Sequence, residues 1–207
     1  PVSTTDTLVQ RYFDQGLVLA YGFNHAEAAR SFYYASKLDT SCAMGYWGYA
    51  YVLGPNYNGG MEPDHYSRAY SAIQQALQLA KKRSTGKEQA LINALAQRYP
   101  REAVEDRKPF DEAYAAAMKA VYGKYPDDAD IGTLYAEALM NLHPWDLWET
   151  SGEPKPWTPE IVQTLEHIIQ TSPKHPGAHH FYIHAVEASQ APSRGIASAR
   201  LFDEDLV

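Results

Sequence analysis

The sequence holds a single cysteine, Cys42, in 207 residues. One thiol excludes an internal disulfide framework, and the apolar neighbours of Cys42 make it a small core residue rather than a nucleophile. The sequence also lacks a run of about 18 apolar residues, the length that a membrane-spanning helix needs. We therefore expect no membrane span.

Clusters of basic residues are scarce as well. The 18 Lys and Arg are outnumbered by 25 Asp and Glu, which gives a net charge of −7 at pH 7. A nucleic-acid surface needs clustered Lys and Arg to neutralise phosphates, so no nucleic-acid partner is expected. The sequence also lacks a glycine-rich phosphate loop after a strand pattern and a G-x-S-x-G nucleophile elbow.

Apolar residues recur at helical spacing along the whole chain. Asn24, with Glu27 three residues later, is typical of a helix N-cap, and an apolar stripe follows it. The same internal offsets return further along the sequence. The matching sets are Ala28, Phe32, Ala35 and Thr40; Ala69, Ile73, Ala76 and Lys81; Met118, Val121 and Pro126; and Ile161, Leu165, Ile168 and Pro173. Their last members lie 41, 45 and 47 residues apart, a period that predicts an array of helix pairs.

This pattern of small, large and small residues followed by proline resembles the second helix of a tetratricopeptide repeat. Tyr12 with Gly16, and Tyr46 with Ala50, resemble the first helix of that motif. Four stretches, "FNHAEAARSF", "CAMGYWGYA", "PWDLW" and "HPGAHHFYIHAVEAS", are similar to a group of uncharacterised bacterial tetratricopeptide-repeat proteins. The resemblance implies an all-α superhelix and a binding role, since such repeats are mostly interaction modules, but it implies no particular activity.

We therefore expect a single domain over residues 1–207, a right-handed α–α superhelix of about four helix pairs. One extra helix is predicted at residues 86–99, and two long loops at 54–67 and 143–160. The resembling proteins continue further, so the chain is interpreted as a fragment or a shortened variant of a longer solenoid. A homodimer contact is predicted at the exposed face of a terminal repeat. Both the bacterial cytoplasm and, after removal of a signal peptide, the periplasm or exterior remain open.

The expected ligand is a peptide, a protein or a small molecule held in a concave groove that includes Tyr182. The loop at 143–160 has four prolines and three tryptophans, and long aromatic loops are more often functional than disordered. A ligand pocket is predicted from Tyr57, Asn58, Trp145 and Trp148. The alternative is structural, with the tryptophans covering the end of the core.

Four of the eight histidines lie between residues 175 and 184. In a helix, His180, His184 and Glu187 share one face, and an i, i+4 histidine pair suits Zn or Cu. His143, in the preceding loop, is the candidate further ligand. The alternative is again structural, with the histidines bonded to loop carbonyls or packed on tryptophan. The predicted function is binding rather than catalysis, with no required cofactor; the alternative is a metal-binding protein or a metal-dependent enzyme.

Overall fold

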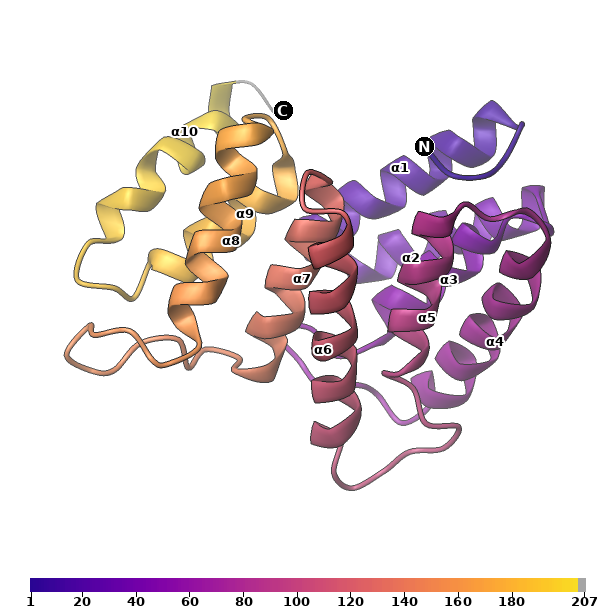
Figure 1. Cartoon of the computed structure of the whole chain (residues 1–207), viewed down its shortest axis with the longest axis horizontal. Coiled ribbons are helices and arrows are strands. Elements are labelled where there is room, and N and C mark those ends of the chain that lie inside the picture. Colours follow the sequence, from indigo (N-terminus) through magenta and orange to yellow (C-terminus); the bar gives the residue numbers. More distant parts are fainter. Residues whose placement is uncertain (205–207) are drawn as a thin grey trace. The chain divides into compact units, whose positions relative to one another are not determined.

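The computed structural model describes residues 1–204, and this part of the chain is all-helical, without a β-strand (Figure 1). The predicted all-α class is therefore confirmed. The helices are α1 (Thr7–Tyr21), α2 (His25–Leu38), α3 (Ala43–Leu53), α4 (His65–Arg83), α5 (Gly86–Ala96), α6 (Lys108–Lys124), α7 (Ala129–Leu142), α8 (Thr158–Thr171), α9 (Pro176–Val186) and α10 (Ile196–Glu204), with a 3₁₀ turn at Pro192–Gly195. None of the helices in residues 1–204 is both long and apolar enough to cross a membrane.

Helix starts follow local capping signals. Asn24 accepts a backbone hydrogen bond in the first turn of α2. Thr85 and Glu88 form a reciprocal capping box at the start of α5, which corresponds to the extra helix predicted at 86–99. Helix α9 begins at Pro176, where the missing backbone N–H costs nothing, and the His175 side chain caps it. Each cap stabilises its helix by about 1 kcal/mol.

The chain divides into two compact units, and the boundary falls inside α6. Unit 1 comprises Pro1–Ala117, with α1 to α5 and the first part of α6. Unit 2 begins at Met118 and holds the rest of α6 and the helices that follow. Each unit has its own core, and the single repeat domain over 1–207 stays a prediction.

The core of unit 1 is built around Phe32, which is fully buried on α2. Its ring lies against Gly16 of α1 and Gly48 of α3. A Cβ added at Gly16 would lie 2.8 Å from the nearest ring carbon, and one added at Gly48 would lie 2.2 Å from the nearest ring carbon. The ring of Phe13 meets Phe32 edge-on at 5.4 Å. Helices α1, α2 and α3 lie beside one another in Figure 1, and the two glycines allow this close approach.

A buried arginine ties the segment after α5 to the end of α3. The Arg98 side chain is 1% exposed and donates a 2.8 Å hydrogen bond to the carbonyl of Pro55. It also pairs with the Asp111 carboxylate at 3.4 Å and lies 4.8 Å over the ring of Tyr114. The loop that contains Pro55, residues 54–64, joins α3 to α4, so the long loop predicted at 54–67 is present and slightly shorter.

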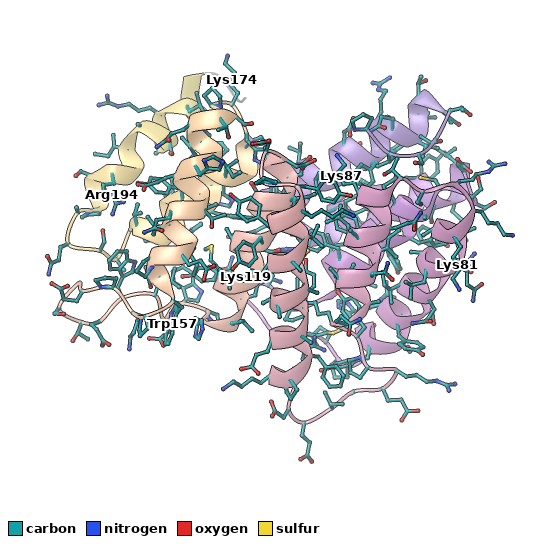
Figure 2. The ribbon with its side chains drawn as sticks, in the orientation of Figure 1. Lys81, Lys87, Lys119, Trp157, Lys174 and Arg194 are labelled. Atoms are coloured by element: carbon teal, nitrogen blue, oxygen red, sulfur yellow. The ribbon has the colours of Figure 1, made fainter. Side chains whose placement is uncertain are left out.

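The core of unit 2 lies between α7, α8 and α9. Its fully buried apolar residues include Ile131, Leu134, Leu165, Ile168, Phe181 and Ala185. The second long loop, residues 143–157, joins α7 to α8. Lys119, labelled on α6 in Figure 2, pairs with Glu160 at the start of α8 at 2.7 Å, and the Tyr135 hydroxyl donates to the same carboxylate at 2.6 Å. These polar contacts join α6, α7 and α8 beside the apolar core.

Candidate functional site

The loop before α8 places its two predicted tryptophans in different surroundings. Trp148 donates from Nε1 to the carbonyl of Ala185 at 2.8 Å, which fastens the loop to α9. Trp145 is 63% exposed and has a φ of 59°, in the left-handed region that bulky side chains avoid. Such a conformation costs about 1–3 kcal/mol and is kept where the surrounding structure imposes it. Trp148 therefore has a structural contact with α9, and Trp145 is largely exposed at the surface.

Tyr57 and Asn58 lie in the first loop and belong to unit 1, whereas Trp145 and Trp148 belong to unit 2. Tyr57 is 3% exposed, while Asn58 is exposed and its backbone N–H donates to the Asn56 side chain at 2.9 Å. A single pocket formed by all four residues stays a prediction.

The histidine pair of α9 has the geometry that its spacing predicts. The Nε2 atoms of His180 and His184 lie 3.2 Å apart. The other ring nitrogen of His184, Nδ1, lies 2.9 Å from the carboxylate of Glu187. The exposed Trp145 meets the His184 ring edge-on at 6.0 Å. The three predicted ligands of α9 are thus brought together, but Glu187 contacts the opposite side of the imidazole from His180.

His143 has a different neighbour. Its ring stacks flat on Trp157, with centroids 3.6 Å apart and planes 5° from parallel. Figure 2 labels Trp157 where the loop enters α8. Within residues 1–204, no three His, Cys, Asp or Glu side chains are placed to share a metal ion. A site with His143, His180, His184 and Glu187 as joint ligands stays a prediction, and what the structure brings together is the pair on α9.

Tyr182, predicted on the groove, is buried and belongs to a polar cluster formed by α8, α9 and the 3₁₀ turn at Pro192–Gly195. Its hydroxyl donates to the Glu166 carboxylate at 2.7 Å, and Arg194 donates to the same oxygen at 2.7 Å. Burial would raise the pKa of Glu166, but these two hydrogen bonds hold it below its usual value. Glu166 is therefore an ion-paired carboxylate and not a proton donor at neutral pH. The hollow beside it has a volume of about 400 Å³.

His179 is a buried histidine whose two ring nitrogens both have partners. Nε2 donates to the carbonyl of Pro173 at 2.9 Å, and Nδ1 accepts from the Ser198 hydroxyl at 2.9 Å. Nδ1 accepts this bond in the neutral ring, the form that burial favours, whereas a protonated ring would donate to the hydroxyl. Burial lowers the pKa of His179, and the nearby His175 lowers it further.

The lowered pKa of His179 predicts a loss of stability in mild acid. Because the unfolded chain binds a proton more readily than the folded one, the stabilisation is complete above about pH 6.5 and is lost as the pH falls through the folded pKa. An NMR titration of the His179 ring should give a pKa below about 6.5. A His179→Asn variant should show a shallower decrease of unfolding free energy between neutral pH and pH 5. A measured His179 pKa at or above about 6.5 would contradict this expectation.

Unit 1 has a cleft of about 590 Å³ between α2 and α4, which the end of α3 also lines. Its lining residues are His25, Ala26, Ala29, Arg30, Tyr33, Tyr49, Val52, Leu53, His65 and Arg68. A second hollow of about 240 Å³ shares Tyr33, Tyr49 and Arg68 and continues to Lys37. We call these two hollows together the α2–α4 cleft.

The α2–α4 cleft combines aromatic and cationic groups. The Tyr33 and Tyr49 rings lie 5.6 Å apart, and Arg68 donates two hydrogen bonds to the Tyr49 hydroxyl, at 2.6 Å and 3.1 Å. The ammonium group of Lys37 lies 4.8 Å over the Tyr33 ring. Among the described lining residues, none is Asp or Glu. The charged residues of the lining are therefore all cationic, in a chain with a net charge of −7.

Most of these residues have no distinctive sequence signal. Tyr33 and Arg68 were not predicted as site residues. His25, in the first turn of α2, also lines the cleft. The only sequence hint is the pair Tyr33 and Tyr34 beside the apolar stripe of α2, since two adjacent exposed tyrosines are unusual on a solvated helix face.

Comparison with known proteins does not assign the chain to a family. No protein-family model matches it, and no curated protein matches its sequence at a significant level. Because a helical fold alone does not give a function, the function has to be argued from the α2–α4 cleft and the α9 histidines.

Proposed function

We propose that this chain is a binding protein, built from tetratricopeptide-like helix pairs, whose ligand lies in the α2–α4 cleft. The observation that carries the proposal is the cleft itself, because its volume of about 590 Å³ falls in the range of small-molecule and peptide-side-chain sites. The apolar lining residues Ala26, Ala29, Val52 and Leu53 supply contact area for an apolar group of the ligand. The proposed activity is recognition without chemistry.

The proposed ligand is a peptide or small molecule with a carboxylate next to an apolar or aromatic group. Arg30 and Arg68 line the cleft and form ion pairs with Glu27 and Asp64, which are surface pairs with exposed side chains. Such pairs contribute only about 0–1 kcal/mol, so a ligand carboxylate can compete for either guanidinium. Tyrosine and arginine are also the residues that most often dominate binding energy at interfaces.

The test compares acidic and basic peptides that contain aromatic residues. We expect fluorescence polarisation to show binding of labelled peptides rich in Asp and Glu, and little binding of matched peptides rich in Lys. Tyr33→Ala and Arg68→Ala should each weaken the binding at least about tenfold, which corresponds to about 1.4 kcal/mol.

Tyr34 provides a matched control for Tyr33. Both side chains are 48% exposed on α2, but Tyr34 packs on Tyr12 with ring centroids 4.7 Å apart and does not line the cleft. Tyr34→Ala should therefore leave the affinity unchanged. Equal losses in Tyr33→Ala and Tyr34→Ala, or equal binding of acidic and basic peptides, would refute the proposed site.

A further inference from the structure

The two Nε2 atoms of His180 and His184 lie at the separation that ligands of one metal ion require. Two imidazole nitrogens at about 2.1 Å from a tetrahedral ion are about 3.4 Å apart, and two adjacent ligands at the same distance from a square-planar ion are about 3.0 Å apart. The observed distance of 3.2 Å falls between these values. Binding would therefore need only a small adjustment of the two rings.

The contact of Glu187 fixes the orientation of one ring. The Nδ1 atom of His184 lies 2.9 Å from the Glu187 carboxylate, so Nδ1 carries the proton and donates it to that carboxylate. The lone pair of His184 is then on Nε2, on the side of His180. Metal-binding histidines commonly have such a carboxylate on the far nitrogen, which fixes the tautomer and raises the basicity of the ligand.

The pair can also be reached from solvent. The side chain of His184 is 22% exposed, and the carboxylate side chain behind it is 43% exposed. On one side the site is bordered by the exposed Trp145, whose ring meets that of His184 edge-on at 6.0 Å. Water can therefore occupy the coordination positions that the two histidines do not fill.

We propose that His180 Nε2 and His184 Nε2 form a two-histidine site for a Zn²⁺ or Cu²⁺ ion, with Glu187 as the positioning residue behind His184. In this site the ion takes the place of the hydrogen that joins the two nitrogens in the metal-free pair. The role of Glu187 differs from the one predicted from its spacing, because it acts through the ring rather than on the ion. This site lies in unit 2 and is independent of the ligand proposed for the α2–α4 cleft.

The test is a calorimetric titration of tag-free protein with Zn²⁺ and, separately, Cu²⁺. We expect one ion per chain, with affinity at least about tenfold weaker after His180→Asn or His184→Ala and about tenfold weaker after Glu187→Gln. His167 is an exposed histidine on α8 of the same unit, and His167→Ala should bind as the wild type does. Circular dichroism confirms that each variant is folded before it is titrated.

Trp145 supplies an optical readout that a merely structural role of the histidines would not give. Cu²⁺ bound at the pair should quench tryptophan fluorescence, and Trp145→Phe should remove part of the quenching while the calorimetric affinity stays unchanged. Absence of binding by the folded wild type would overturn the site. Wild-type affinity in the folded His184→Ala protein would overturn it as well.

Discussion

Replacing Arg98 with alanine is expected to lower the free energy of unfolding by about 3–5 kcal/mol, the usual cost of removing one partner of a buried ion pair. The side chain of Arg98 is 1% exposed and that of Asp111 is 16% exposed. Without the guanidinium, the carbonyl of Pro55 loses a donor and Asp111 keeps only its 3.0 Å contact with Arg107. The loss of packing against Tyr114 adds to the cost.

Two further variants distinguish the loss of the buried ion pair from the general effect of removing a positive charge on the unfolding free energy. Arg101, three residues later, is exposed, so Arg101→Ala should change the unfolding free energy by no more than about 0.5 kcal/mol. Arg98→Lys keeps the charge but not the planar group and should fall between the two. Urea unfolding followed by circular dichroism measures all three. Similar losses for Arg98→Ala and Arg101→Ala would show that the buried arrangement does not stabilise the fold.

The helices could be predicted because their signals are local. Asn24 caps α2 and Pro176 begins α9, and each acts through residues within one turn. The stripe of Ala28, Phe32 and Ala35 is fully buried, as helical periodicity predicts. The buried position of Arg98 could not be predicted in this way, because its partners come from residue 55 and from the next helix.

The two candidate sites also differ in how far local sequence spacing predicts them. His180 and His184 meet because a helix repeats every 3.6 residues, so spacing alone was sufficient. Which nitrogen of His184 faces Glu187 depends on the rotation of the ring, about which spacing says nothing. Tyr33 and Tyr34 are neighbours of one type with equal exposure, and only the packing of α2 beside α3, with α4 across the cleft, decides that Tyr33 lines it.

Gly48→Ala is expected to lower the free energy of unfolding by about 1–3 kcal/mol, the cost of overpacking a filled core. Alanine is the better helix former by about 1 kcal/mol, so propensity alone predicts the opposite sign. The added Cβ would lie 2.2 Å from Cδ1 of Phe32. This ring is fully buried and also lies against Gly16, so it has no open space into which to move.

Gly123 on α6 is the matched control, because a Cβ added there meets no atom within 4 Å. Gly123→Ala should therefore raise the unfolding free energy by up to about 1 kcal/mol, through propensity alone. If the ring of Phe32 causes the loss at Gly48, a smaller side chain should relieve it, and Phe32→Leu should cost less in the Gly48→Ala background than in the wild type. Additive losses in this double-mutant cycle, measured by urea unfolding, would place the cause outside this contact, since two residues that clash in the folded core give a coupling energy.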